Sequence, residues 1–257
     1  MILALDVGNT NIVMGCIENH KTLFTERIST DHNKTDLEHA ISIKTVLDLH
    51  HIDPSTVTGA IIGSVVPPIT ELLQKAIYKV AGCNAMIVGP GVKTGLNIKM
   101  DNPATVGADL IIGAIAAIDA YPCPQIVIDM GTATTMIVID KDRNYIGGMI
   151  MPGVRVSIDS LTSRTSQLPK ISLDAPKRLI GKNTIDCMKS GILYGSASML
   201  DGMIDRIADE IGEMPTVVAT GGLASRITPL CRHDIILDDE LLMRGLTMIY
   251  EKNAGDN

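Results

Sequence analysis

The sequence is poor in aromatic residues and contains no block of basic residues. Five tyrosines and one phenylalanine occur among 257 residues, tryptophan is absent, and the net charge is −7. Proteins that bind nucleic acid normally present a basic surface to the phosphates. The composition therefore argues against nucleic-acid binding as the main function.

The sequence also lacks long apolar runs and paired cysteines. No apolar stretch approaches the roughly 20 residues that a membrane-spanning helix needs, so we expect no membrane association. Asp6 interrupts the first apolar run and no basic residue precedes it, so we expect no signal peptide. The five cysteines stand singly without a CxxC motif, which favours unpaired thiols in the cytoplasm and argues against a zinc site.

The residues that are present are typical of a globular protein with a large core, since 46% are hydrophobic and 20% are charged. In the first half, the patterns predict strands at 2–6, 11–17, 22–29, GAIIGSVV and NAMIV, and helices at 36–50, 69–81 and 103–120. In the second half they predict strands at 125–129, 134–140, 144–151 and PTVVAT, and helices at 153–166, 184–212 with Thr184 as N-cap, and 239–252. The YPCPQ segment at 121–125 predicts a boundary between two domains, 1–122 and 123–257.

Two stretches share an unusual pattern, MILALDVGNTNIVMG at the N-terminus and IVIDMGTATTMIVI at 126–139. In each, an apolar run ends in an aspartate (Asp6 or Asp129), a glycine follows two positions later (Gly8 or Gly131), hydroxyl residues come next, and a second apolar run begins. A carboxylate at the end of a buried strand is costly unless something pairs with it. Two copies about half a chain apart indicate a duplicated element.

The pattern alone allows two interpretations of these turns. They could be simple hairpins, because Gly8 and Asn9 both tolerate positive φ. They could also bind a polyphosphate, with backbone N–H groups of the turn residues directed at phosphate oxygens and the acids holding cations that neutralise the phosphates. The N–H groups in question belong to Gly8, Asn9, Thr10, Gly131 and Thr132.

A third glycine turn, VVATGGLAS at 217–225, is either a plain strand–helix connection or a close contact with a nucleoside. The sequence contains neither GxxxxGK[ST] nor GxGxxG, so a P-loop and a Rossmann site are not expected.

Taken together, these segments resemble a known family, the type III pantothenate kinases of the acetate kinase, hexokinase and actin superfamily. The resemblance runs nearly from end to end. Its segments are DVGNTNIV, ISTDHNKTDLE, SVVPP, GPGVKTGL, DNPATVGAD, DMGTATT, YIGGMIMPG, LP, IGKNT, SGILYG, ATGGLA and IYEKN. It implies duplicated actin/hexokinase-like (ribonuclease H-like) α/β domains, each with a mixed sheet and flanking helices, and each forming one half of the ATPase.

The resemblance also implies an activity. Members of the family transfer the γ-phosphoryl group of ATP to the 4′-hydroxyl of pantothenate, the first step of coenzyme A synthesis. They act as homodimers with the active site at the subunit interface. They use Mg²⁺ with ATP, and a monovalent cation, K⁺ or NH₄⁺.

Residue roles follow from the resemblance by position. Asp109 would be the general base, Asp129 the K⁺ ligand and Asp6 a Mg²⁺ ligand. The ATP-binding residues would be Asp6, Val7, Gly8, Asn9, Thr10, Asn11, Ile12, Val13 and Thr132. The pantothenate-binding residues would be Met100, Gly107, Ala108, Asp109, Leu110 and Thr184, the last of these from the partner subunit. From its setting alone, Asp109 is either a structural acid in the first turn of a helix or a functional one.

Three residues in the acceptor region depart from the pattern of the family. Met100 stands where the family usually has Tyr, Leu110 where it has Arg, and Gly113 where it has Asn. The change at 110 removes a cation that can pair with an anion, and the change at 100 removes a phenolic donor. Three interpretations stay open: a pantothenate kinase with altered acceptor binding, a kinase for a related and less polar acceptor, and an inactive nucleotide-binding relative.

Overall fold

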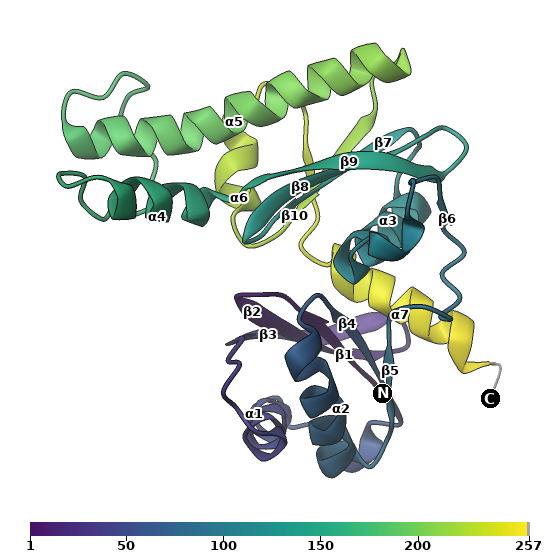
Figure 1. Cartoon of the computed structure of the whole chain (residues 1–257). Coiled ribbons are helices and arrows are strands. Elements are labelled where there is room, and N and C mark those ends of the chain that lie inside the picture. The colour runs from purple at the N-terminus through teal and green to yellow at the C-terminus, as the bar shows by residue number, and fades with distance from the viewer. Residues whose placement is uncertain (256–257) are drawn as a thin grey trace. The chain divides into compact units, whose positions relative to one another are not determined.

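A computed structural model describes residues 1–255 of the chain. The chain forms two compact units. The first contains Met1–Leu96, Asp101–Ala116 and Glu240–Asn257, and the second contains Asn97–Met100 and Ala117–Asp239. Each unit is a mixed sheet with helices on its faces (Figure 1).

The first unit has a five-stranded sheet in the order β3-β2-β1-β4-β5. The central strand β1 pairs antiparallel with β2 and parallel with β4. The strands are β1 (Ile2–Val7), β2 (Asn11–Glu18), β3 (Lys21–Ser29), β4 (Gly59–Ser64) and β5 (Ala85–Ile87). Helices α1 (Asp36–Leu49) and α2 (Pro67–Ala81) pack against one face, and α7 (Leu241–Ala254) and the first part of α3 (Ala108–Ala120) pack against the other.

The second unit has a six-stranded sheet in the order β11-β10-β7-β8-β9-β6. Its strands are β6 (Asn97–Ile98), β7 (Gln125–Met130), β8 (Ala133–Ile139), β9 (Asn144–Pro152), β10 (Thr216–Thr220) and β11 (Ile236–Leu237). Helices α4 (Val154–Arg164), α5 (Thr184–Ile211) and α6 (Ala224–Ile227) share one hydrophobic core with β7, β8 and β10.

The two sheets have the same topology. In each, the first three strands along the chain form an antiparallel meander, and two further strands add in parallel beside the first of them. The order β3-β2-β1-β4-β5 therefore corresponds to β9-β8-β7-β10-β11. The short strand β6 is an addition to the second sheet and pairs parallel with β9. The prediction of a mixed α/β fold with two similar sheets is therefore confirmed.

One predicted helix start and one predicted N-cap are wrong. The Pro103–Thr105 segment forms a separate 3-10 turn, Val106 is extended, and α3 begins only at Ala108. The N-cap of α5 is Asn183, whose side chain accepts a hydrogen bond from the Asp186 N–H at 2.9 Å, so Thr184 is the first helical residue. Asparagine is among the best N-cap residues, which explains why the cap lies one position earlier than expected.

The last helix packs within the first unit rather than the second. Gly245 of α7 lies against the Ile112 backbone of α3, where a Cβ would overlap it, and Leu246 shares a core with Ile112. The compact units therefore divide the chain differently from the two sequence halves. The predicted domains at 1–122 and 123–257 describe the two halves of a duplicated sequence, and that division stays a prediction. No helix in the described part of the chain is long and apolar enough to cross a membrane.

Candidate active site

The turn between β1 and β2 consists of three residues at the end of the central strand. Asp6 pairs in register with Val13, and the chain leaves the strand after Val7. The N–H of Gly8 donates to the carbonyl of Asn11 at 3.0 Å. Thr30, which follows β3, donates its hydroxyl to the Gly8 carbonyl at 2.6 Å. The turn is therefore closed by its own backbone and held by the neighbouring strand.

The turn between β7 and β8 has the same construction. Asp129 pairs in register with Thr135, and the N–H of Gly131 donates to the carbonyl of Ala133 at 3.0 Å. Only Gly131 and Thr132 lie between the strands, so this turn is one residue shorter than the first. The structure thus confirms that the repeated sequence pattern forms one repeated element.

Two details of the predicted turns are wrong. Neither Gly8 nor Asn9 adopts a positive φ. The N–H groups of Gly8 and Gly131 already donate within their turns, so they are not directed at phosphates. The turn residues whose side chains are well exposed are Asn9, Thr10 and Thr132.

The N-terminus of α4 lies beside the second turn. The N–H of Gly153 donates to the carbonyl of Thr132 at 3.2 Å, and a Cβ at position 153 would overlap that carbonyl. The helix begins at Val154 without a side-chain cap, so its unpaired N–H groups and positive dipole end are near Thr132. The sequence predicted a helix at 153–166, but it did not predict the contact between the start of this helix and the second turn.

Asp129 lies between two threonines at the end of β7. Thr135 of β8 and Thr220 of β10 are its partners in register, and such cross-strand neighbours share one face of a sheet. The hydroxyl of Thr135 is buried and has no hydrogen-bond partner among the described residues. Gly221 follows with φ +100°, and a Cβ there would lie 2.5 Å from Asp129 Oδ1. The Gly-Gly turn therefore leaves space for the Asp129 carboxylate. Both residues, Gly221 and Asp129, belong to the second unit.

Asp109 is the second residue of α3 and is partly buried. Its Oδ1 accepts a hydrogen bond from the Leu110 N–H at 2.9 Å. Burial raises the pKa of the Asp109 carboxyl, and the backbone hydrogen bonds oppose this rise only in part. A Cβ at Gly107 would overlap the carboxylate, so the glycine leaves the space that Asp109 Oδ1 occupies.

Asp109 and the first turn lie at the same end of the first sheet. A Cβ at Gly107 would lie 3.6 Å from Val65, and the N–H of Val65 donates to the carbonyl of Val7 at 3.0 Å. Val7 directly precedes the turn, so the segment that carries Asp109 rests on the chain that leads into it.

The remaining predicted acceptor residues are distributed over both units. Leu110 belongs to the first unit and is partly buried. Met100 and Thr184 belong to the second unit, and Thr184 is exposed at the start of α5.

Two duplicated mixed sheets with an aspartate and a turn at the end of each central strand define an actin/hexokinase-like protein. A solved structure with this fold is that of a Sinorhizobium meliloti protein assigned as a 2-dehydro-3-deoxygalactonokinase, with a TM-score of 0.59 and 14% identity over 98% of this chain and 97% of that chain. At such identity the likeness shows the fold alone.

The chain belongs to the type III pantothenate kinase family, whose model matches residues 2–206. The type III pantothenate kinases of Bacillus cytotoxicus and Halalkalibacterium halodurans are each 43% identical to it over 254 residues. These matches cover 99% of this chain and 97% and 100% of theirs. The family and fold predicted from the sequence are therefore confirmed.

The raised pKa of Asp109 predicts that its carboxylate destabilises the folded protein at neutral pH. A carboxyl with a raised folded pKa favours folding at low pH, and this contribution is lost as the pH rises through the folded value. Asp109→Asn, which stays neutral, should therefore be more stable than the parent at pH 7, and the difference should shrink toward pH 4. Urea unfolding at several pH values measures this, with the exposed Asp101→Asn as control. A less stable Asp109→Asn protein would instead identify a structural acid of the helix.

Proposed function

We propose that the protein is an ATP-dependent kinase that phosphorylates the 4′-hydroxyl of pantothenate. The observation that carries the proposal is Asp109, a partly buried carboxylate with a raised pKa at the same end of the first sheet as the turn between β1 and β2. Membership of the type III pantothenate kinase family supports the choice of substrate.

In this proposal Asp109 accepts the proton of the acceptor hydroxyl as its oxygen attacks the γ-phosphorus. A raised pKa makes the carboxylate a stronger base and brings it nearer to the working pH. Gly107 keeps the carboxylate in place because any larger residue would overlap it. The hydrogen bond from the Leu110 N–H fixes one oxygen and leaves the other to take the proton.

The two turns and the start of α4 would hold the phosphates of ATP. The residues assigned to ATP are those from Asp6 to Val13 together with Thr132. The contacts fall on Asn9, Thr10 and Thr132 rather than on Gly8, because the N–H of Gly8 is used within the turn. The helix end beside Thr132 adds a positive dipole, which favours an anion.

Cations would be held by oxygen atoms at the strand ends. The described residues contain no group of three or more His, Cys, Asp or Glu side chains arranged for a metal. The surroundings of Asp129 nevertheless fit a monovalent cation, because a buried hydroxyl without a partner (Thr135) and a second threonine (Thr220) stand beside the carboxylate. We assign K⁺ or NH₄⁺ to Asp129 and, with ATP, Mg²⁺ to Asp6. When bound, these cations neutralise charge on the phosphates.

The active protein would be a homodimer in which Thr184 reaches the acceptor of the partner subunit. Large apolar side chains are exposed on α4 and on the segment that leads into α5. Ile180 is 80% exposed and Leu179 61%, and Val156, Leu161 and Ile185 are also exposed. Such exposed apolar groups next to Thr184 are typical of an interaction surface.

The proposed reaction predicts ATP consumption that depends on pantothenate. The purified protein should release ADP in K⁺ and Mg²⁺ only when pantothenate is added. Asp109→Asn should bind ATP normally but turn over about 10²–10⁴-fold more slowly, the usual contribution of a general base. A coupled ADP assay and ATP titration measure both values. Near-normal turnover of Asp109→Asn would place the base elsewhere.

The proposed cation site predicts a selective response to K⁺. Activity, and the melting temperature in MgADP, should rise with K⁺ or NH₄⁺ and much less with Na⁺. Thr135→Val removes only a hydroxyl and should weaken the response to K⁺, and Asp129→Asn should abolish it, because both remove oxygen ligands. Equal melting temperatures in all three salts would contradict a monovalent site at Asp129.

The proposed dimer predicts that a charge on its surface will dissociate it. Ile180→Asp should convert the protein from dimer to monomer and abolish activity, because Thr184 would no longer reach the partner's acceptor site. Leu49→Asp, at a side chain 71% exposed on α1, should leave both unchanged. Light scattering measures the mass. A parent protein that is monomeric and active would exclude the shared site.

The departures at Met100 and Leu110 predict weak acceptor binding. If pantothenate is the acceptor, its carboxylate has lost a charged partner worth roughly 1.5–3 kcal/mol. The KM for pantothenate should then be high, and Leu110→Arg with Met100→Tyr should lower it by about tenfold for each 1.4 kcal/mol regained, with little change in the KM for ATP. The two effects need not add, because the residues would share a pocket.

The same departures favour a second candidate acceptor, a less polar pantoyl compound without the carboxylate. Such a compound would then be phosphorylated by the parent protein in preference to pantothenate. A parent that phosphorylates no pantoyl compound, with a double variant that binds pantothenate no better, would identify an inactive nucleotide-binding relative.

A further inference from the structure

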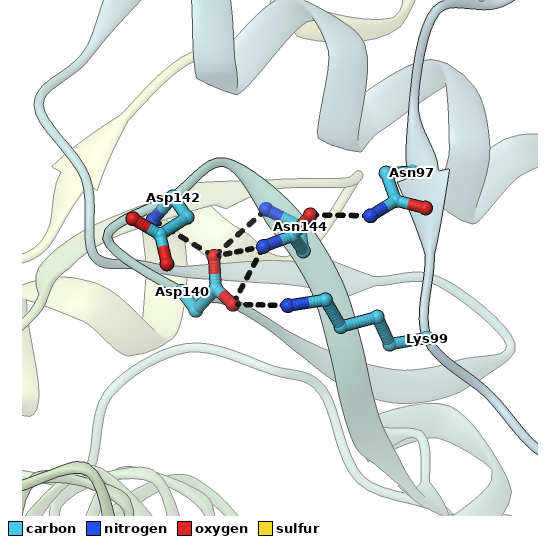
Figure 2. Close-up of polar contacts among 5 residues, drawn as sticks. All are labelled: Asn97, Lys99, Asp140, Asp142 and Asn144. Carbon is cyan, nitrogen blue, oxygen red and sulfur yellow. Dashed lines mark hydrogen bonds and ion pairs between the residues drawn. The ribbon is translucent and has the colours of Figure 1, made fainter.

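Asp140 closes the hairpin between β8 and β9 with one carboxylate oxygen. Its Oδ1 accepts the backbone N–H groups of Asp142 and Asn144, each at 2.9 Å. The same oxygen also accepts the side-chain amide of Asn144 at 2.9 Å. Figure 2 shows the carboxylate at the centre of these bonds. This side chain adds to the two backbone hydrogen bonds that close the turn, Asp140 N–H to the Asn144 carbonyl and Arg143 N–H to the Asp140 carbonyl.

The other oxygen and Asn144 connect this hairpin to the short strand β6. Asp140 Oδ2 accepts from the Asn144 amide at 2.8 Å and from Lys99 Nζ at 3.4 Å. The oxygen of the Asn144 amide accepts from the Asn97 amide at 2.5 Å (Figure 2). The Lys99 N–H also donates to the carbonyl of Tyr145 at 2.8 Å. Asn144 is buried, so its bonds to Asp140 and Asn97 are partly shielded from water, whereas the contact of Lys99 with Asp140 is exposed.

The carboxylate of Asp140 is held in its ionised form. Burial raises its pKa, but the hydrogen bonds from Asn144 and Lys99 outweigh that effect and lower the pKa below its usual range. The carboxylate is therefore ionised at neutral pH, where it can pair with the Lys99 ammonium.

Strand β6 needs these side chains because its own pairing is small. It forms only two pairs with β9, at Asn97 and Ile98. The residues from Asp101 to Thr105 that follow are exposed, and the chain is next held at the start of α3. Asn97–Met100 belong to the second unit and Asp101–Ala116 to the first. The network therefore fixes one end of a segment whose other end carries Asp109.

We propose that Asp140, acting through Asn144, Asn97 and Lys99, is a positioning residue for the acceptor side of the active site. The inference rests on the proposed function, in which Met100 and Asp109 contact the acceptor. Met100 directly follows Lys99, so a shift of the anchored end moves Met100 first. The ATP turns at Asp6 and Asp129 are held by other contacts and do not depend on this network.

The variant Asp140→Asn separates the two roles of the carboxylate. Its remaining oxygen can still accept the backbone N–H groups of the hairpin, whereas the new amide cannot accept from Lys99 or Asn144. We expect faster hydrogen exchange in peptides covering residues 97–106, and a KM for pantothenate raised by about tenfold with a nearly unchanged KM for ATP. Lys99→Met, at an exposed position, should give a smaller change of the same kind and keeps the test available if Asp140→Asn folds poorly.

Asp142→Asn is the matched control, because its backbone, and not its carboxylate, takes part in the network. It should change neither hydrogen exchange nor either KM. Unchanged exchange at 97–106 in Asp140→Asn, or an equal rise in both KM values, would overturn the inference. If the parent protein uses no pantoyl acceptor, the proposed function fails, and the exchange measurements alone still decide whether Asp140 anchors the segment.

Discussion

Each half of the fold depends on a carboxylate at the end of a central strand. A buried strand that ends in an acid must provide space and polar neighbours for it. In the second unit, Gly221 provides the space, because any side chain there would meet the Asp129 carboxylate, and Thr135 and Thr220 provide hydroxyls in register. The place of the glycine pair at the end of β10 follows from this requirement.

Asp109 shows the cost of burying the carboxylate that the proposed reaction uses. Its burial opposes ionisation, and the structure compensates in part with backbone hydrogen bonds from Leu110 and Asp109 rather than with a cation. A paired carboxylate would be more stable but a weaker base. The raised pKa is therefore a property that folding alone would not favour, which supports a functional role for Asp109 over a structural one.

The sequence could predict the parts of the fold that depend on local pattern. Strands that end at Asp6 and Asp129 follow from their apolar runs, and the repeated Asp-x-Gly predicted the duplicated turns. The sequence could not predict which N–H groups donate hydrogen bonds within the turns, because that depends on strand register and loop length. The turns at Gly8 and Gly131 differ in both. It also missed the contact of Gly153 with Thr132, which joins residues that are far apart in the chain. The packing of α7 in the first unit was missed for the same reason.

The proposed acceptor side and the proposed nucleotide side are built from different kinds of contact. The turns that the proposal assigns to ATP belong to central strands that are paired on both sides, so a substitution there disturbs a sheet. Met100 lies in an exposed connection that is held at one end by side chains, and Leu110 lies in the first turn of a helix. Residues in such positions can change without loss of the fold. This difference explains how the chain keeps the family's phosphate-binding pattern while it departs from that pattern at positions 100 and 110.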